Sequence, residues 1–473
     1  MSISHNSAIS ETLASQYARA RKSRDARFDG LFFVAVKTTG IYCRPICPAT
    51  PALEHNVQYF VSAIGAAQQG FRPCMRCRPD SSPNSFAWLG TETTFRRALS
   101  LIQSGALSDI SVPQLAERLG VSDRYLRKLF NQQMGVSPKQ YALYQQCLFA
   151  KKLLQETQLA VQEVAFAAGF NSVRRFNDTI KQQLALTPGD LRKASSASES
   201  GITLRLSYRP PYNTTLLFNF LGPRVISGIE ASDERGYTRS IVVNTGKQSV
   251  RGYFSIKPVV DEHQFEVFIQ LEQTDVLYAV VQRIRTIFDL DAPITEIDQS
   301  LSAAFGDAIT VKSGLRVPGI WDSFEAGIRA ILGQQVTVNA AKNLLILLVE
   351  NLGELMPSGP KGISHYFPSP QAILASDLSF FGMPQSRKDT MHRLAQHFID
   401  SPDPEDIDKW LDIKGIGPWT VNYVKMRATK DPDIWLAGDA GIKNALAKVG
   451  KTFSIEDLKP WRSYATLQLW NQL

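Results

Sequence analysis

The spacing of apolar residues divides the chain into four parts. Residues 31–36 (Leu-Phe-Phe-Val-Ala-Val) form a short apolar run that is typical of a strand. Between residues 86 and 193, apolar side chains recur at helical spacing and strand patterns disappear. Apolar runs at 241–243 and 265–271 then predict strands, and helical spacing returns at Thr274 and continues to the C-terminus. We therefore expect a small part with strands, a helical part, an α+β part and a final helical bundle.

Within the helical part, one pattern occurs twice. Ser111 is a candidate N-cap, Pro113 lies in the first turn, and Gly120 ends a short helix that is followed by a turn and a second helix. The same arrangement recurs 49 residues later, where Gly169 matches Gly120. A single copy is equally consistent with ordinary packing of two helices, but two copies favour DNA binding. In a helix-turn-helix the second helix offers its leading side chains to the major groove, here Arg124, Tyr125, Arg127 and Lys128 in the first copy and Arg174 and Arg175 in the second.

Four of the five cysteines form two close pairs. Three residues separate Cys43 from Cys47, and two separate Cys74 from Cys77. Chelate loops of this length let four sulfurs converge tetrahedrally on one Zn²⁺ ion. Such clustering is a poor disulfide framework and indicates a reducing compartment. Because closed four-cysteine sites are usually structural, the residues alone leave two interpretations open: an ion that holds the fold, or an ion that activates a thiolate.

A second candidate site lies near the C-terminus. Gly415 and Gly417 form a Gly-x-Gly turn, and we expect both glycines to supply the positive φ angles of a hairpin and Pro418 to open the next helix. Backbone amides at such a turn can bind a DNA phosphate without reading the base sequence. Asp439 follows about twenty residues later. Trp419 and Tyr423 are four residues apart on the predicted helix and so share a face.

Charge and hydropathy narrow the class of partner. The 52 Lys and Arg residues exceed the 44 Asp and Glu residues, and the net charge of +8 favours a polyanion such as nucleic acid. The hydrophobic fraction of 44% and the charged fraction of 20% are those of ordinary globular proteins. No apolar stretch is long enough to span a bilayer, and the first eleven residues are polar. We therefore expect no membrane partner and a cytoplasmic, nucleoid-associated location.

Longer motifs resemble known regulators of the response to DNA methylation. Residues 38–47 (TTGIYCRPIC) and 70–80 (GFRPCMRCRPD) closely resemble the N-terminal domain of the Ada adaptive-response proteins. The doubled helix-turn-helix, with Ser-Pro and Thr-Pro pairs at 137–138 and 187–188, resembles the AraC-type DNA-binding unit, which follows directly in Ada proteins. The resemblance implies one Zn²⁺ ion held by four thiolates and methyl transfer from a methylated DNA phosphate to the first of them, Cys43. Because methylation of Cys43 would make the zinc site less negative, we expect it to strengthen promoter binding by the helix-turn-helix unit. The implied zinc ligands are Cys43, Cys47, Cys74 and Cys77.

The second half contains four further motifs: YRPPY at 208–212, GIRAILGQ at 327–334, FFGMP at 380–384 and KPWRSY at 459–464. With these motifs, residues 204–473 resemble the AlkA-type 3-methyladenine DNA glycosylases of the helix-hairpin-helix superfamily. It implies that Asp439 stabilises positive charge on the sugar and orients water, without a cofactor. The implied pocket, an electron-rich box for a cationic flipped base, consists of Phe220, Trp419, Tyr423 and Trp470.

Three positions qualify this resemblance. Gln335 stands where the family places an apolar residue that fills the gap left by the flipped base. Gly441 replaces a family leucine, which we expect either to enlarge the pocket or to loosen its selectivity. Trp419 occupies the position of the lysine that strand-cutting members carry, so we expect a monofunctional glycosylase that leaves an abasic site.

Together, the patterns and resemblances predict a multidomain α+β protein. A small four-cysteine zinc domain is expected at residues 1–82 and an all-α tandem helix-turn-helix domain at 86–195. A TBP-like α+β domain is expected at 202–300 and an all-α helix-hairpin-helix glycosylase bundle at 301–473. The expected partners are alkylated and promoter double-stranded DNA and RNA polymerase, and the chain is expected to act as a monomer.

Three functions remain open at this point. In the first, one chain combines base excision, methyl transfer and transcriptional activation. In the second, the protein is only a regulator, whose glycosylase-like half binds damaged DNA without cutting it. In the third, the glycosylase is active and the zinc site is purely structural. Asp439 and the aromatic set favour the first function.

Overall fold

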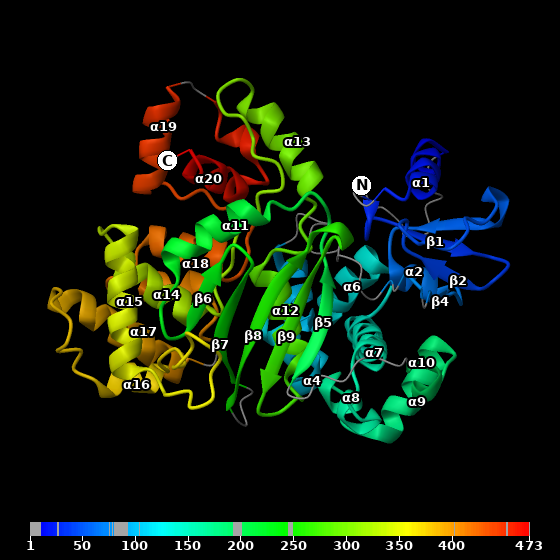
Figure 1. Ribbon diagram of the computed structural model, residues 1–473, viewed down its shortest axis with the longest axis horizontal. Coiled ribbons are helices and arrows are strands. Elements are labelled where there is room, and N and C mark those ends of the chain that lie inside the picture. Colours follow the sequence, from blue (N-terminus) through cyan, green and yellow to red (C-terminus); the bar gives the residue numbers. More distant parts are fainter. Residues whose placement is uncertain are drawn as a thin grey trace.

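The computed structural model describes residues 11–25, 28–74, 76–77, 79, 93–103, 105–192, 201–244, 249–401, 403–450 and 453–472. The predicted domain ends at residues 82, 86 and 195 lie outside these residues. A five-stranded sheet, green in Figure 1, stands near the centre of the molecule. The N-terminal sheet and the helix-turn-helix region lie on one side of it, and the helices of the C-terminal bundle lie on the other. Among the described residues, no helix is long and apolar enough to cross a bilayer.

The N-terminal part is a four-stranded sheet with the order β3-β1-β2-β4. Strands β1 and β2 pair antiparallel through a turn in which Gly40 has a φ of +65°, a conformation that suits glycine. The sheet carries the cysteines on β2 and on the loops beside it. Its elements are α1 (Glu11–Ser23), β1 (Phe33–Val36), β2 (Ile41–Cys43), η2 (Glu54–Asn56), β3 (Val57–Phe60), α2 (Ala63–Gln68) and β4 (Arg72–Pro73).

The next part is helical and contains both helix-turn-helix copies. As predicted, Ser111 caps the first helix of the first copy, where its side chain and that of Gln114 form a reciprocal capping box. Ser122 and Ser172 cap the two recognition helices, α6 and α9. The helices are α3 (Thr93–Gln103), α4 (Ala106–Asp109), α5 (Val112–Arg118), α6 (Asp123–Met134), α7 (Pro138–Glu156), α8 (Val161–Ala167), α9 (Val173–Leu184) and α10 (Pro188–Leu191).

The central sheet is antiparallel, with the order β5-β9-β8-β7-β6. Its strands alternate between buried and partly exposed residues, as expected for a sheet with one face on a core. The predicted strands at 241–243 and 265–271 lie within β7 and β9. The elements are β5 (Ile202–Ser207), α11 (Thr214–Leu221), η5 (Gly222–Arg224), β6 (Glu230–Asp233), β7 (Gly236–Asn244), β8 (Ser249–Val259), η6 (Val260–Glu262), β9 (Gln264–Leu271) and α12 (Leu277–Ile287).

The remaining residues form the C-terminal helical bundle. Its first helix, α13, crosses residue 300, where a domain boundary was predicted. Apolar residues of α13 pack against those of α19 and α20, so this helix belongs with the bundle. The helices are α13 (Ile294–Phe305), α14 (Ser323–Gly333), α15 (Val338–Leu352), α16 (Pro370–Ala375), α17 (Gln385–Asp400), η7 (Ile407–Asp412), α18 (Pro418–Arg427), α19 (Ala440–Val449), η8 (Glu456–Leu458) and α20 (Arg462–Trp470).

Two of the hydrophobic cores are shared between neighbouring parts. One core joins the cysteine-bearing sheet to the first helix-turn-helix, and the hydroxyls of Tyr42 and Tyr144 meet inside it. Another core joins the second helix-turn-helix to the central sheet and α12, where the rings of Phe149 and Tyr278 pack edge to face at 5.1 Å. Helix α7 supplies Tyr144 to the first core and Phe149 to the second. The two copies are therefore attached to different neighbours through one continuous helix.

Candidate functional site

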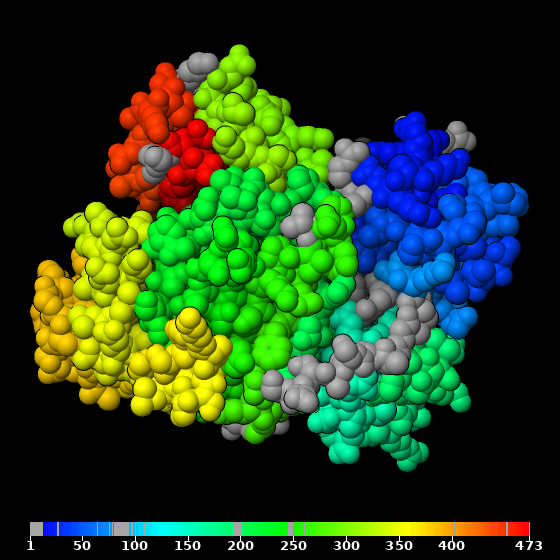
Figure 2. All heavy atoms as spheres, viewed as in Figure 1, coloured from blue at the N-terminus to red at the C-terminus, as the bar shows by residue number. Residues whose placement is uncertain are grey.

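A cleft of about 1410 Å³ lies between α15 and α19 and extends to α18 and the end of α20. On the face in Figure 2, a notch separates the yellow residues of α15 from the orange residues of α19. Small-molecule pockets are usually about 300–1,000 Å³, so this cleft has room for more than one base. The predicted site residues that line it are Gln335, Gly417, Trp419, Tyr423, Asp439 and Trp470.

Asp439 is held in the cleft by three N–H donors. It is the N-cap of α19, where its Oδ1 accepts a hydrogen bond from the amide of Ile442 at 3.0 Å. The same oxygen accepts from Trp470 Nε1 at 2.9 Å, and Oδ2 accepts from Trp419 Nε1 at 3.1 Å. The carboxylate is therefore fixed in position by a helix N-terminus and two indoles, as a group must be if it is to stabilise a charge that develops during a reaction.

The four predicted aromatic residues form two pairs. Trp419 and Tyr423 are one turn apart on α18, and their rings stack with centroids 5.3 Å apart. Phe220 on α11 and Trp470 on α20 lie nearly parallel, with centroids 6.3 Å apart. Trp419 and Trp470 converge on the same carboxylate. The structure thus brings Trp419 and Trp470 to Asp439, each with a second aromatic ring stacked on it, and of the four only Phe220 does not line the cleft.

Gly441 makes the contact between Trp470 and Asp439 possible. A Cβ atom at this position would lie 2.9 Å from Cδ1 of Trp470 and 3.0 Å from Oδ1 of Asp439. The sequence suggested that the missing side chain enlarges the pocket. Instead, the Trp470 indole occupies the space beside Gly441.

Two arginines lie over the Phe220 ring. The guanidinium carbon of Arg224, at the end of η5, lies 3.8 Å from the ring centroid, and that of Arg427, at the end of α18, lies 5.0 Å away. Both arginines line the cleft. Burial and the nearby Arg427 charge lower the pKa of Arg224 to about 10, and burial also lowers the pKa of Arg427. Both side chains remain charged at neutral pH.

The hairpin before α18 differs from its prediction at one glycine. Gly415 has the expected positive φ, +100°, and a Cβ atom there would overlap the side chain of Thr390. Gly417 has a φ of −111° and is the N-cap of α18, with Pro418 as the first helical residue. The expectation of positive φ at Gly417 was wrong because an N-cap residue takes an extended backbone conformation.

Gln335 lies exposed at the tip of the turn between α14 and α15. Its φ of +57° is in the left-handed region, which costs energy for a residue other than glycine. The preceding residue, Gln334, anchors the turn: its side chain donates to Thr420 Oγ1 at 3.3 Å, and its carbonyl accepts from Arg387 at 2.9 Å. Strained residues on fixed turns are common where a ligand is clamped.

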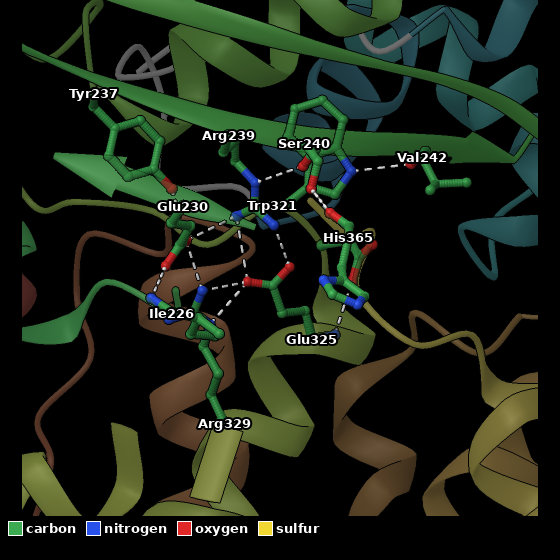
Figure 3. Close-up of polar contacts among 11 residues, drawn as sticks. Ile226, Glu230, Tyr237, Arg239, Ser240, Val242, Trp321, Glu325, Arg329 and His365 are labelled. Atoms are coloured by element: carbon green, nitrogen blue, oxygen red, sulfur yellow. Dashed lines mark hydrogen bonds and ion pairs between the residues drawn. The ribbon is translucent and has the colours of Figure 1, made fainter. Parts of the chain in front are cut away.

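A buried ion network joins the central sheet to the bundle behind the cleft (Figure 3). Glu325 on α14 pairs with Arg239 of β7 at 2.6 Å and with Arg329, one turn along its own helix, at 2.6 Å. Arg329 also pairs with Glu230 of β6 at 2.7 Å. Burial opposes ionisation of Glu325, but the two arginines outweigh it and lower the pKa of this carboxyl. The network fixes α14, and hence the Gln335 turn, relative to the sheet.

The four cysteines of the N-terminal sheet converge on one point. Because β2 and β4 pair in parallel, with Tyr42 opposite Pro73, the residues that follow these partners, Cys43 and Cys74, emerge side by side. The four candidate ligand sulfurs, from Cys43, Cys47, Cys74 and Cys77, all lie within 4.8 Å of one another. Backbone amides point at two of the sulfurs: Arg44 donates to Cys77 at 3.3 Å, and Arg76 donates to Cys74 at 3.4 Å. This donor set fits a tetrahedral Zn²⁺ ion.

Arg44, which follows Cys43, ties the cysteine cluster to the rest of the molecule. Its guanidinium forms a buried ion pair with Asp29, with Nε 2.8 Å from Oδ1, and donates to the Cys77 carbonyl at 3.1 Å. The backbone carbonyl of Asp29 accepts from Arg209, just after β5, at 2.9 Å. Contacts therefore run from the cysteine cluster to the C-terminal half.

The two recognition helices present matching faces. On α6, Arg124, Tyr125, Arg127 and Lys128 are exposed, and on α9 Arg174 and Arg175 are exposed. Leu126 and Phe176 occupy equivalent positions and are fully buried. Arg127 pairs with Asp123 at 2.9 Å. Exposed cations on the leading turns suit contacts with DNA phosphates and base edges.

The family comparisons agree with this division of the chain. Family models match residues 16–80 (metal binding domain of Ada), 115–194 (helix-turn-helix domain) and 203–322 (AlkA N-terminal domain). The chain is 34% identical over 483 residues to the probable bifunctional transcriptional activator/DNA repair enzyme AlkA of Mycobacterium tuberculosis, an alignment that covers 96% of this chain and 95% of that protein. The chain belongs to this family of bifunctional transcriptional activators and DNA repair enzymes.

Relatives of each half also match separately. DNA-3-methyladenine glycosylase 2 of Escherichia coli is 31% identical over 281 residues, which cover 56% of this chain and 95% of that protein. The bifunctional transcriptional activator/DNA repair enzyme AdaA of Bacillus subtilis is 28% identical over 202 residues, which cover 42% of this chain and 92% of that protein. Among solved structures, a 3-methyladenine DNA-glycosylase from Archaeoglobus fulgidus is 19% identical, with a TM-score of 0.46, and the alignment covers 56% of this chain and 96% of that one.

Family membership confirms the predicted resemblances and the mixed α+β fold class. The chain is an enzyme of the DNA glycosylase kind, joined to a DNA-binding helix-turn-helix unit and an Ada-type zinc-binding domain. The roles of the individual site residues and the domain boundaries remain predictions.

The sequence did not reveal several groups that shape the two sites. Arg224, Arg427 and the Arg44–Asp29 pair carry no motif of their own, and each is defined by partners far away in the chain or by burial. One signal was present for Arg44, which directly follows the first cysteine. Charged residues are otherwise common enough in the chain that their sequence positions do not distinguish them from solvated ones.

Proposed function

We propose that the C-terminal half excises alkylated bases of the 3-methyladenine type from double-stranded DNA by hydrolysis. The observation that carries this proposal is the Asp439 carboxylate, fixed by Trp419 and Trp470 within a cleft large enough to receive a flipped nucleotide. The strained turn at Gln335 supports it, because a side chain there can fill the gap that the base leaves in the duplex.

The chemistry needs little more than charge stabilisation. As the N-glycosidic bond breaks, its electron pair leaves with the alkylated base, which is cationic before cleavage and becomes neutral. Positive charge then develops on the sugar, where the Asp439 carboxylate stabilises it. A water molecule adds to the anomeric carbon and loses its proton to Asp439 or solvent. Since Trp419 stands at the lysine position of strand-cutting relatives, we expect an intact strand with an abasic site and no covalent intermediate.

Asp439→Asn tests the base-excision step. The amide keeps the size of the side chain and an oxygen for the helix cap, but it removes the negative charge. We expect the rate of 3-methyladenine release from methylated duplex DNA to fall at least about a hundredfold. The melting temperature should fall only modestly, because the helix cap remains but the amide nitrogen cannot accept from Trp419 Nε1. An unchanged rate would remove Asp439 from the mechanism. If the wild-type protein releases no base, the regulator-only function is correct.

We further propose that the N-terminal domain transfers a methyl group from a DNA methylphosphotriester to Cys43. Cys43 and Cys47 are half-exposed, whereas Cys74 and Cys77 are buried, so only the first pair is open to DNA. The four cysteines would hold one Zn²⁺ ion, which would keep their thiols deprotonated at neutral pH. The Cys43 sulfur attacks the methyl carbon in line, a sulfur–carbon bond forms, and the phosphate oxygen leaves with the electron pair of the broken bond, which restores the phosphodiester.

Mass spectrometry of the zinc-loaded protein after incubation with methylated DNA tests this transfer. We expect one methyl group on the peptide that contains Cys43 and none after Cys43→Ala. Cys147→Ala is the matched control, because this thiol is fully buried in α7 and burial raises its pKa to about 12. Methyl groups on the other cysteines, or none on Cys43, would support a structural zinc site.

The two activities are proposed to serve one response. Methylation makes the cysteine cluster less negative, which favours its approach to the DNA backbone. The shared core joins the cysteine-bearing sheet to the first helix-turn-helix, so we expect the same event to increase promoter binding by the exposed cations of α6 and α9. Activation would then proceed through RNA polymerase, with the protein acting as a cytoplasmic, nucleoid-associated monomer.

A further inference from the structure

Among the residues that the structure describes, two arginines of the cleft have no carboxylate partner. Arg224 donates to the carbonyl of Phe220 at 2.9 Å. Arg427 donates to the carbonyl of Pro318 at 2.6 Å and to the hydroxyl of Tyr423 at 3.2 Å. Within the described part of the chain, neither guanidinium hydrogen bonds to a carboxylate, and Nε and Nη2 of Arg224 and Nη2 of Arg427 have no partner.

The third arginine of the cleft shows the contrast. Arg329 also lines it but pairs with Glu230 at 2.7 Å and Glu325 at 2.6 Å. Arg224 and Arg427 instead face the same aromatic ring, and the repulsion between them contributes to the lowered pKa of Arg224. Two neighbouring cations held without counterions beside a binding cleft reduce stability, and such arrangements are concentrated at functional sites.

These arginines change what the cleft can recognise. An aromatic box alone attracts any cationic base through its ring faces. Here a guanidinium lies over the Phe220 ring, 3.8 Å from its centroid, and the positive charges of the two arginines oppose the approach of every cationic base to a similar extent. Discrimination between one alkylated base and another must therefore come from the hydrogen-bonding edge of the base. Guanidinium groups only donate, so they favour an edge that accepts hydrogen bonds.

We propose that Arg224 and Arg427 are specificity-determining residues that favour alkylated guanine over alkylated adenine. Guanine presents two acceptors, O6 and N7, which match the fork of an arginine, whereas adenine presents an amino donor beside N7. Methylation at N3 lies on the opposite edge of the purine and leaves the hydrogen-bonding groups of both guanine and adenine at positions 6 and 7 intact. This inference rests on the proposed base excision and adds an order of preference among the alkylated bases that are excised.

The test compares two bases that carry the methyl group at the same nitrogen. DNA treated with dimethyl sulfate contains both 3-methylguanine and 3-methyladenine, and chromatography measures their single-turnover release in one reaction. Arg224 is the residue to change, because Arg427 anchors the backbone at Pro318. Arg224→Met keeps an unbranched side chain on the Phe220 ring and removes the donors and the charge. Arg224→Lys keeps the positive charge but not the planar set of donors of the guanidinium group.

We expect Arg224→Met to lower the ratio of 3-methylguanine to 3-methyladenine release rates about tenfold. The release of 3-methyladenine should stay the same or rise, because one opposing charge is gone. Arg224→Lys should give an intermediate ratio. A ratio unchanged within twofold, or an equal loss of both bases, would show that Arg224 does not select the base edge. If the wild-type protein releases neither base, the proposed excision itself is wrong, and the inference falls with it.

Discussion

Gly441 leaves no room for a side chain, since Trp470 and Asp439 lie 2.9–3.0 Å from where its Cβ atom would be. We expect Gly441→Ala to displace the Trp470 indole from Asp439 and to lower base release about tenfold or more, because small misplacements of catalytic groups are costly. Helix formation should not suffer, as alanine is the better helix former. The rate of 3-methyladenine release from methylated DNA checks this prediction.

Gly382→Ala is the matched control for this substitution. A Cβ atom at Gly382 would have no neighbour within 4 Å, so the same added methyl group should leave base release unchanged. Equal effects of the two substitutions, or no effect of Gly441→Ala, would show that the contact between Trp470 and Asp439 is not needed for excision.

At the level of single residues, the motifs predicted which residues belong to the site, but the sequence did not predict how their side chains pack. The sequence predicted that Trp419, Trp470 and Asp439 belong to one site, and the structure brings them into hydrogen-bond contact. It did not predict that Trp470 fills the space beside Gly441. That detail depends on the approach of α19 and α20, two elements whose relative placement no local pattern specifies.

At the level of elements, the ion network between the sheet and α14 provides the next prediction. Glu325 is buried and serves both Arg239 and Arg329. Glu325→Gln removes the negative charge and, among the described residues, leaves Arg239 and Arg329 with Glu230 as their remaining carboxylate partner. We expect the free energy of unfolding to fall by about 3–5 kcal/mol, the usual cost of breaking a buried ion pair from one side. Urea unfolding followed by tryptophan fluorescence measures this change.

An exposed pair between the same regions serves as the control. Arg251 on β8 pairs with Glu354, just beyond α15, at 2.8 Å, and the Glu354 side chain is 58% exposed. Because water screens such pairs, Glu354→Gln should change stability by less than about 1 kcal/mol. Similar effects of the two substitutions would mean that burial does not set the strength of the network.

Elements with local signals were predictable, whereas contacts between elements were not. The cap at Ser111 and the proline at the start of α18 are encoded within a few residues, and each lies where the sequence indicated. The Arg239–Glu325 pair joins residues 86 positions apart. In the sequence, each of its members looks like an ordinary solvated charge.

At the scale of the whole molecule, changes in composition predicted four parts but not how their cores merge. Tyr42 and Tyr144, 102 residues apart, meet in the core shared by the cysteine-bearing sheet and the first helix-turn-helix. An apolar residue on a strand shows that one face is buried but not against what. The same limit applies to Arg209, whose contact with Asp29 connects the two halves.

The shared core makes the effect of losing the zinc site specific to one region. Cys47→Ala removes one predicted ligand, and without the ion the loops around Cys43 lose their common anchor. Because Cys43 ends β2, where Tyr42 packs into the shared core, we expect faster hydrogen exchange in the N-terminal sheet, in α3, α5 and α6, and at the start of α7. The cores of the C-terminal bundle contain no residue of that region, so α14–α20 should keep their protection.

Hydrogen exchange with mass spectrometry on the full-length protein measures exchange in the N-terminal region and in α14–α20 in one experiment. Release of 3-methyladenine should persist in the same sample. Treating the wild-type protein with a zinc chelator should reproduce the pattern, which separates loss of the ion from loss of the side chain. If exchange rises only in the N-terminal sheet, the zinc site does not stabilise the helix-turn-helix. If exchange rises equally throughout the chain, the two halves unfold together, and the contact between Arg209 and Asp29 would transmit the change.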